Sequence, residues 1–450
     1  MKPPQKRYLT GIDWAINTLD YRARKTTGHG NSSQIILFLK DRLDAERLRP
    51  LLARTTAEMP VLQGRVARAW NLCPYWKIDS SSDSKLLLTE ETRTGISRDE
   101  IVDCFQTKVN QKFTGRREHL RFHLLHVDGG RSCLAMHFDH RLLDAYGAEL
   151  FLELLTRTAA GEDAGLRDKI KLVEPPSLGD WRRRFKAGQK VNRLRLALAG
   201  QETAAISLSS GRKPRFSRFQ VATMAGEESA RIVDNAYRQA GYLMLLPYLL
   251  ACALESFDRL FRARNLAVGD YVVPVSVVRR SPETLWEDLF FNRLSFVFFQ
   301  IPSRLAAAGN RDELIAALRS QLYTHLKNRL PEDFCHAAML TRIAPLPIMN
   351  RLADIPLRGK VGSFYFSCLK ESGLTSRRFL GAEIDNLLHT PHMPMPPGLG
   401  LACNLFQDKI NITLSAAQGI MERSEERMLL DDLTGRLTGN LAWPDSSSTV

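Results

Sequence analysis

The sequence of 450 residues has few cysteines and no apolar run long enough to cross a membrane. Its seven cysteines are an odd number and include no C-x-x-C pair, which argues against a disulfide framework and against a zinc site. The longest apolar candidate, residues 242–253, is too short for a bilayer and is typical of a buried helix. Residues 1–7 lack the apolar core of a signal peptide. Together these absences favour a reducing, cytoplasmic location.

Acidic residues are too few to balance the basic ones, so the chain carries a net charge of +14. Basic surfaces attract nucleic acid, anionic membranes, acidic carrier proteins or phosphorylated cofactors. The sequence has no zinc-finger or RNA-binding signature, which disfavours nucleic acid as a partner. An excess of arginine that only solvates the surface is the alternative explanation of the charge.

A histidine lies four residues ahead of an aspartate, between a hydrophobic run at 132–136 and a helix-like run at 148–155. At such a strand-to-helix junction an imidazole can project into a cleft. Histidine is the side chain best suited to moving protons near neutral pH. The spacing therefore predicts His140 as a catalytic base, with Asp144 fixing the turn that follows. The alternative is that both residues merely pack or cap a helix.

The order of hydrophobic segments predicts a layered α/β sandwich. In the first half, strands are expected at 34–39, 61–69, 121–127 and 132–137, and helices at 44–58 and 97–113. In the second half, strands are expected at 216–225 and near residues 271, 294, 362, 399 and 410, and helices at 227–239, 243–264 and 424–437. A chain of this length exceeds the usual single domain, so two lobes are expected. Pro175 and Pro176 mark a break, which gives a first lobe at 1–175, a basic linker at 176–215 and a second lobe at 216–450.

Residues 139–145 read D-H-R-L-L-D-A and resemble the H-x-x-x-D motif of the chloramphenicol-acetyltransferase-like superfamily. This superfamily includes plant-type BAHD acyltransferases, peptide-synthetase condensation domains, wax ester synthases and dihydrolipoyl acyltransferases. Ala145 stands where the motif usually has glycine, and Asp139 stands where condensation domains have a first histidine. The histidine lies about a third of the way along the chain, which resembles the two-lobed branch, in which one chain holds both lobes and a monomer can be active.

Further segments extend the resemblance over most of the chain. They look like the superfamily's opening strand and its P-x-L strand, a later strand ending in arginine, its G-N segment with Phe291 in place of glycine, and its closing Pro/Gly loop. These segments are residues 35–39, 60–62, 271–279, 291–295 and 394–401. The D-F-G-W-G signature of the BAHD group is absent.

The resemblance implies an enzyme that moves an acyl group from a thioester to a hydroxyl or amine. The thioester would be acyl-CoA or an acyl carrier protein acting as co-substrate, with no bound cofactor and no metal. His140 would act as general base in a tunnel between the lobes, and Asn292 and Ser295 are candidates to stabilise the oxyanion. Asp144 would pair with Arg279 or Arg280 and hold the loop. Since no nucleophilic serine or cysteine motif is present, direct transfer is expected rather than a covalent intermediate. Such enzymes serve lipid or secondary metabolism.

Two other functions remain open on the same fold. One is a catalytically silent binding or regulatory protein. The other is a peptide-synthetase-type condensation protein that forms amides.

Residues 181–198 mix aromatic and leucine side chains with many cations. This pattern suits a helix on an anionic membrane surface, an acidic carrier protein as partner, or a solvated linker helix between lobes. His389 and His392 flank a Thr-Pro pair, and we expect them to be surface histidines rather than metal ligands.

Overall fold

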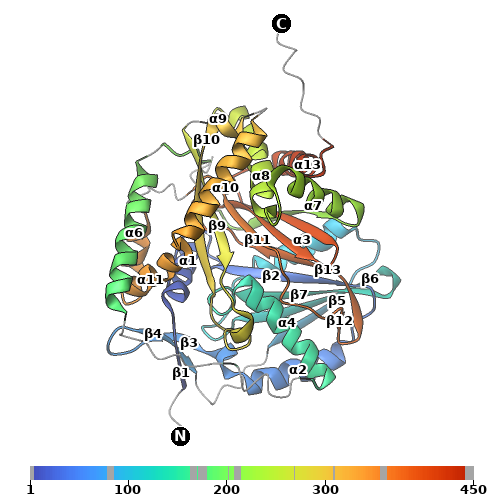
Figure 1. Ribbon diagram of the computed structural model, residues 1–450. Helices are drawn as coiled ribbons and strands as arrows, with labels where there is room; N and C mark the ends of the chain where they lie inside the picture. The colour runs from blue at the N-terminus through green and yellow to red at the C-terminus, as the bar shows by residue number, and fades with distance from the viewer. Residues whose placement is uncertain are drawn as a thin grey trace.

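The computed structural model describes residues 5–78, 86–162, 170, 180–200, 202–206, 214–267, 269–307, 310–354 and 362–440. It shows two lobes, each built on a sheet with helices against it (Figure 1). The layered α/β architecture and the two lobes expected from the sequence are confirmed. Within the described residues, no single helix has the length and apolarity needed to cross a membrane. Helices α7 (Glu227–Ala240) and α8 (Leu245–Ala263), taken together, would meet that test but are bent by 95°.

The sheet of the first lobe has the strand order β12-β13-β2-β7-β6-β5. Neighbouring strands are antiparallel except β5 and β6, which are parallel. The strands are β2 (Ser32–Leu39), β5 (Leu87–Thr92), β6 (Leu120–Val127), β7 (Arg131–Asp139), β12 (Arg378–Phe379) and β13 (Ala382–Pro391). The helices of this lobe are α2 (Ala45–Glu58), α3 (Arg98–Val109) and α4 (Ala145–Ala160).

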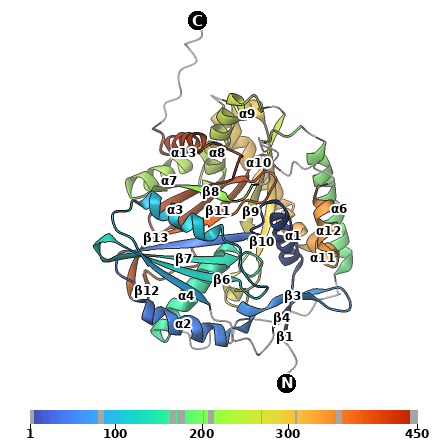
Figure 2. The same cartoon turned by 180° about the vertical axis from the view of Figure 1, so that it is seen from behind.

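Strand β7 carries apolar side chains on both faces because helices cover both faces of the sheet. Met136 and Phe138 pack in the core beneath α2 and α4, while Cys133 and Ala135 pack on the opposite side against α3. Figure 1 shows α2 and α4 in front of this sheet, and Figure 2 shows α3 over its other face. The double cover explains why 132–136 reads as a continuous hydrophobic run rather than as an alternation.

The sheet of the second lobe has the order β10-β9-β11-β14-β15-β8. The strands are β8 (Ser217–Met224), β9 (Asp270–Val278), β10 (Leu294–Pro302), β11 (Tyr365–Leu369), β14 (Leu399–Phe406) and β15 (Lys409–Ala417). The helices are α7 (Glu227–Ala240), α8 (Leu245–Ala263), α9 (Ser303–Ala306), α10 (Arg311–Lys327) and α13 (Arg423–Thr438). Most of the apolar run at 242–253 forms the start of the buried helix α8, as expected, but Tyr242 and Leu243 precede the helix and are each 75% exposed.

The remaining elements lie along one side of the molecule. A small sheet has the order β1-β4-β3. Its strands are β1 (Gln5–Tyr8), β3 (Arg65–Arg68) and β4 (Pro74–Ile78). The helices are α1 (Gly11–Thr26), α6 (Trp181–Ala199), α11 (Leu330–Thr341) and α12 (Leu346–Asp354). Three short 3-10 turns complete the elements, at Pro60–Gln63, Asp128–Gly130 and Pro282–Thr284.

The division into 1–175, 176–215 and 216–450 does not describe the membership of the sheets. Strands β12 and β13 lie beyond residue 216 in the chain but belong to the first sheet, where β13 pairs with β2. The side chain of Asn386 in β13 also exchanges hydrogen bonds of 2.8 and 3.0 Å with that of Asn411 in β15. The second half of the chain therefore supplies strand β13 to the first sheet, and a side chain of that strand also bonds to the second sheet. The expected break at residues 175–176 lies outside the described residues.

Candidate active site

The turn that carries His140 lies between the end of β7 at Asp139 and the start of α4 at Ala145. The backbone N–H of His140 donates to the carbonyl of Asn31, at an N···O distance of 3.0 Å. Asn31 is buried, and its own N–H donates to the Asp20 carboxylate at 3.0 Å. The backbone at His140 is thereby anchored to the loop after α1.

A buried charge network holds the first half of the turn. The Asp139 carboxylate accepts hydrogen bonds from His119 Nδ1 at 2.9 Å and from the N–H and the Nε of Arg141, both at 3.0 Å. The Arg141 guanidinium also lies 3.6 Å from Asp20. Burial alone would raise the pKa of Asp139, but the positive charge of Arg141 and the His119 hydrogen bond hold that pKa well below its usual range. Asp139 therefore stays ionised and braces the turn.

The second half of the turn is held by Asp144, which caps α4 and binds the second lobe. Its Oδ1 accepts from the N–H of Gly147 at 2.6 Å and from the Arg280 guanidinium at 2.7 Å. Its Oδ2 accepts from the N–H of Arg293 at 2.9 Å. Arg280 also donates to the carbonyls of Asp288 and Phe291. The ion pair is almost entirely buried and joins the His140 turn to the segment that follows β9.

Of the two arginines expected to pair with Asp144, Arg280 does so and Arg279 does not. Strand β9 ends at Val278, and successive side chains of an extended chain point to opposite sides. Arg279 accordingly points away from Asp144 and pairs with Glu332 at 3.1 Å, where both side chains are about one-third exposed. Alternation of side chains is therefore the physical reason that only one of the pair reaches α4.

Asn292 joins the second lobe to the first, whereas Ser295 bonds within the second half of the chain, and the side-chain donors of both are engaged. The side-chain nitrogen of Asn292 donates to the Asp13 carboxylate at 3.1 Å and to the carbonyl of Arg141 at 3.4 Å. The hydroxyl of Ser295 donates to the carbonyl of Pro331 at 2.7 Å. Their hydrogens are used in these bonds, so stabilising an oxyanion would require the bonds to open, and that role stays a prediction. Asn292 still belongs to the site, since it supports the backbone next to His140.

Ala145 is the first residue of α4 and does not need the conformational freedom of glycine. It is not among the non-glycine residues with positive φ, because Asp144 starts the helix in the ordinary way. The position that does need glycine is 147. A Cβ there would lie 2.8 Å from the Arg280 Nη2, 2.9 Å from the carbonyl oxygen of Leu289 and 3.0 Å from the Asp144 Oδ1.

We expect Gly147→Ala to separate Asp144 from Arg280 and to lower the free energy of unfolding by about 1–3 kcal/mol, as overpacking of a filled site does. Urea unfolding followed by circular dichroism measures this loss. Gly115→Ala is the matched control, since a Cβ at Gly115 meets its nearest atom, the N of Arg117, at 3.9 Å. Equal stability of the two variants would show that the ion pair tolerates the methyl group.

The His140 imidazole differs from the histidines around it. His119 binds Asp139, and His389 binds Glu149 at 2.5 Å. His137 is fully buried and stacks on Phe113, and burial lowers its pKa well below the usual value. His140 is half-buried, and its Nδ1 has no hydrogen-bond partner among the described residues. Its ring is thus uncommitted although its backbone is fixed.

His389 and His392 were expected to be surface residues, and this expectation is wrong. Both are buried, with 5% and 9% of their surface exposed. His392 lies between Ser32 Oγ at 3.0 Å and Asn110 Oδ1 at 3.3 Å, and burial lowers its pKa to about 3. Both histidines belong to β13 or the loop after it, which the sequence did not place inside the first lobe.

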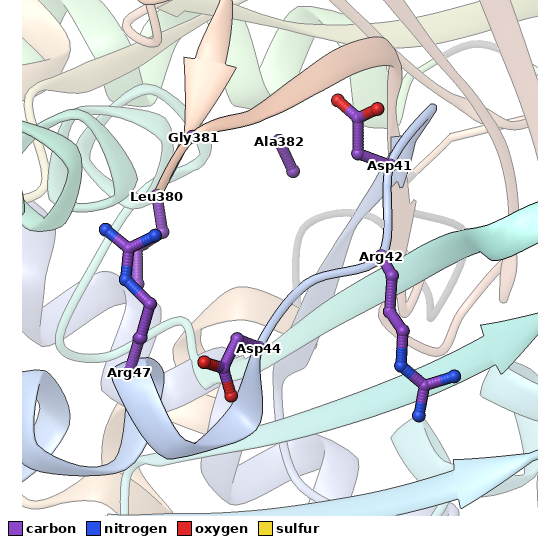
Figure 3. A pocket seen from close by; sticks show the side chains of 7 residues that line it. All are labelled: Asp41, Arg42, Asp44, Arg47, Leu380, Gly381 and Ala382. Carbon is purple, nitrogen blue, oxygen red and sulfur yellow. The ribbon is translucent and has the colours of Figure 1, made fainter.

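Two cavities were found among the described residues, and one of them lies next to the turn. One is lined by Asn31, His392 and the Pro394–Met395 loop and holds about 10 Å³, room for a single water molecule. It lies beside the residue that anchors His140. A larger cavity of about 210 Å³ lies away from the site, at the start of α2, and Figure 3 shows Asp41, Arg42, Asp44 and Arg47 at its rim. Its lining mixes both signs of charge.

Sequence reasoning missed the polar residues of α1 that support the site. Asp13, Asn17 and Asp20 are spaced by four and three residues, so they lie on one face of the helix, and all are buried. Asp13 binds Asn292, and Asp20 binds Asn31 and Arg24. A polar stripe at helical spacing between apolar residues was the available signal. It indicates a helix face turned toward a buried polar site.

No protein-family model matches the sequence, and no curated protein is significantly similar to it. Solved structures match nearly the whole chain. The trichothecene 15-O-acetyltransferase of Fusarium sporotrichioides matches with a TM-score of 0.70 and 12% identity over 96% of this chain and 95% of its own. The first condensation domain of the calcium-dependent antibiotic synthetase matches with a TM-score of 0.65 and 14% identity over 96% of both chains.

The epimerization domain from the third module of tyrocidine synthetase B matches with a TM-score of 0.59 and 13% identity over 97% of both chains. These identities are low, and the likeness is one of structure along the full chain. The protein therefore has the two-lobed fold of these condensation and epimerization domains and of the trichothecene 15-O-acetyltransferase.

Proposed function

We propose that this protein is an acyltransferase that moves an acyl group from a thioester to a hydroxyl or amine. The observation that supports this most directly is the state of His140. Its backbone is fixed by Asn31, while its half-buried ring makes no hydrogen bond to any residue that the structure describes. A positioned and uncommitted imidazole is what general-base catalysis requires.

In the proposed reaction, Nε2 of His140 takes the proton of the acceptor as its oxygen or nitrogen attacks the thioester carbon. The carbonyl electrons move to oxygen and form a tetrahedral oxyanion. When the intermediate collapses, the carbon–sulfur bond breaks and the imidazolium returns its proton to the leaving thiolate. The acyl group thus passes directly from sulfur to the acceptor, and no covalent acyl-enzyme forms. The donor would be acyl-CoA or an acyl carrier protein, reaching His140 through a tunnel between the lobes, and one chain would suffice.

The second candidate is amide formation of the condensation type. It is favoured by the match to a condensation domain over almost the full length of both chains. The two candidates share the base and the thioester and differ in the acceptor, which in the second would be an amine held on a carrier protein rather than a free alcohol or amine.

Release of free thiol tests the proposal. The protein is mixed with acyl-CoA and acyl-pantetheine donors of increasing chain length, with and without pooled alcohols and amines, and the thiol is measured with a colorimetric reagent. We expect acceptor-dependent release, and mass spectrometry of the product distinguishes ester from amide. Saturable donor binding without thiol release from any donor would instead identify a silent binding protein.

A further inference from the structure

Exposed apolar side chains gather along the side of the molecule that carries α6, α12 and the turn between β3 and β4. We call this surface the α6–α12 face. Trp70, at the tip of the hairpin, is 95% exposed, and Trp181, at the start of α6, is 62% exposed. The other exposed large apolar residues of the face are Leu72, Phe185, Leu196, Ile343, Ile348 and Leu352. Exposed apolar residues scattered singly need no explanation, but several on neighbouring segments do.

Hydrogen bonds tie the three segments into one surface. The guanidinium of Arg68, at the end of β3, donates to the carbonyls of Ile343 and Ala344 between α11 and α12. Arg195 of α6 donates to the carbonyl of Leu352 in α12. Figures 1 and 2 both show α6 beside α11, with the β3–β4 hairpin extending below them. The exposed residues therefore keep fixed positions relative to one another.

Helix α12 has two apolar sides, and only one is used inside the protein. Leu346 and Met349 pack against the core of the first lobe, and Asn350 accepts a hydrogen bond from Arg22 of α1. Ile348 and Leu352, four residues apart, form the other side and are about half exposed. A helix that buries one apolar side and presents another is built to meet something apolar outside the protein.

Positive charge surrounds these apolar residues. Helix α6 contains seven arginines and lysines and no acidic residue. Arg182, Arg183, Lys186 and Arg193 are exposed. A second copy of this chain, itself carrying a net charge of +14, would be repelled by such a surface. An anionic partner is favoured.

We infer that the α6–α12 face binds an anionic lipid membrane. Tryptophan and phenylalanine rings settle at the boundary between headgroups and acyl chains, and arginine and lysine bind anionic headgroups. The protruding Trp70, the amphipathic α12 and the cationic α6 supply both parts of such a contact. This inference does not depend on the acyltransferase proposal.

Flotation with vesicles tests the inference. Vesicles of phosphatidylcholine alone are compared with vesicles containing about one-third phosphatidylserine, and we expect the wild type to bind the anionic vesicles at least about tenfold more strongly. Arg182→Gln/Arg183→Gln/Lys186→Gln and Trp70→Ala/Ile348→Ser/Leu352→Ser should each weaken that binding about tenfold or more. The matched control is Tyr237→Ser/Arg427→Gln, which alters an exposed aromatic residue and an exposed cation on α7 and α13, at another end of the molecule.

Tryptophan fluorescence gives a second readout, since insertion of Trp70 and Trp181 should shift the emission to shorter wavelength only with anionic vesicles. Three outcomes would overturn the inference. They are no flotation of the wild type, equal binding to both kinds of vesicle, and loss of binding in the cationic variant with no effect of the apolar variant. The last result would indicate an acidic protein or nucleic acid as the partner.

Discussion

Replacing His140 by alanine should reduce acyl transfer by about 10²–10⁴-fold, the share of rate that a positioned general base supplies. The free energy of unfolding should change little, because within the described part of the chain the His140 ring makes no hydrogen bond and its backbone N–H is held by Asn31. Thiol release at saturating donor measures the first quantity, and urea unfolding measures the second.

His119→Ala is the informative comparison for this experiment. His119 is buried and binds both Asp139 and the carbonyl of Gly64, so its loss should destabilise the fold as well as the turn. If His140→Ala keeps wild-type turnover, the imidazole is not the base. If it loses stability as well as turnover, a structural role explains the result better than a chemical one.

Removing the charge pair beneath the turn should have the largest effect on stability. Asp144→Ala and Arg280→Ala should each lower the free energy of unfolding by about 3–5 kcal/mol, because each leaves a buried charge without its partner. Asp144→Asn should cost less than Asp144→Ala, since asparagine can still accept the Gly147 hydrogen bond that caps α4. Unfolding by urea at neutral pH provides the measurement.

Arg279→Ala is the matched control for Arg280→Ala. Its ion pair with Glu332 is about one-third exposed, and such pairs are worth less than about 1 kcal/mol. The Asp144→Ala/Arg280→Ala double variant should be clearly more stable than the sum of the single losses predicts, since the second change removes the charge that the first left unpaired. Additive losses, or a control as destabilised as Arg280→Ala, would refute the assignment of Arg280.

The sequence predicts the fold well where local pattern decides it. The strands expected at 121–127 and 132–137 are β6 and β7, and the helix expected at 424–437 is α13. The strand expected at 61–69 was only partly right. Pro60 begins a 3-10 turn that ends at Gln63, and only Arg65–Arg68 is extended. Proline fixes φ at a value that favours the start of a helical turn.

Pairing across long distances could not be read from local pattern. Strand β13 was not expected, and its partner β2 lies about 350 residues earlier in the chain, so the pairing depends on the assembled lobes. The same holds for the site. Spacing singled out His140 and Asp144, and the resemblance to the superfamily pointed to the arginines after β9. The choice of Arg280 over Arg279 and the roles of Asp13 and Asp20 depend on which elements meet in space.

The place of β13 in the first sheet limits how the two halves of the chain can be separated, both in evolution and in motion. A gene fragment ending near residue 215 would leave one edge of β2 unpaired, since its neighbour on that side, β13, begins only at Ala382. The two halves of the chain therefore cannot be exchanged as separate modules. The ribosome must also reach β13 before the sheet of the first lobe can be completed. If the two lobes open, they must rotate about the chain segments that lead into and out of β13, because full separation would break the pairing of β13 with β2.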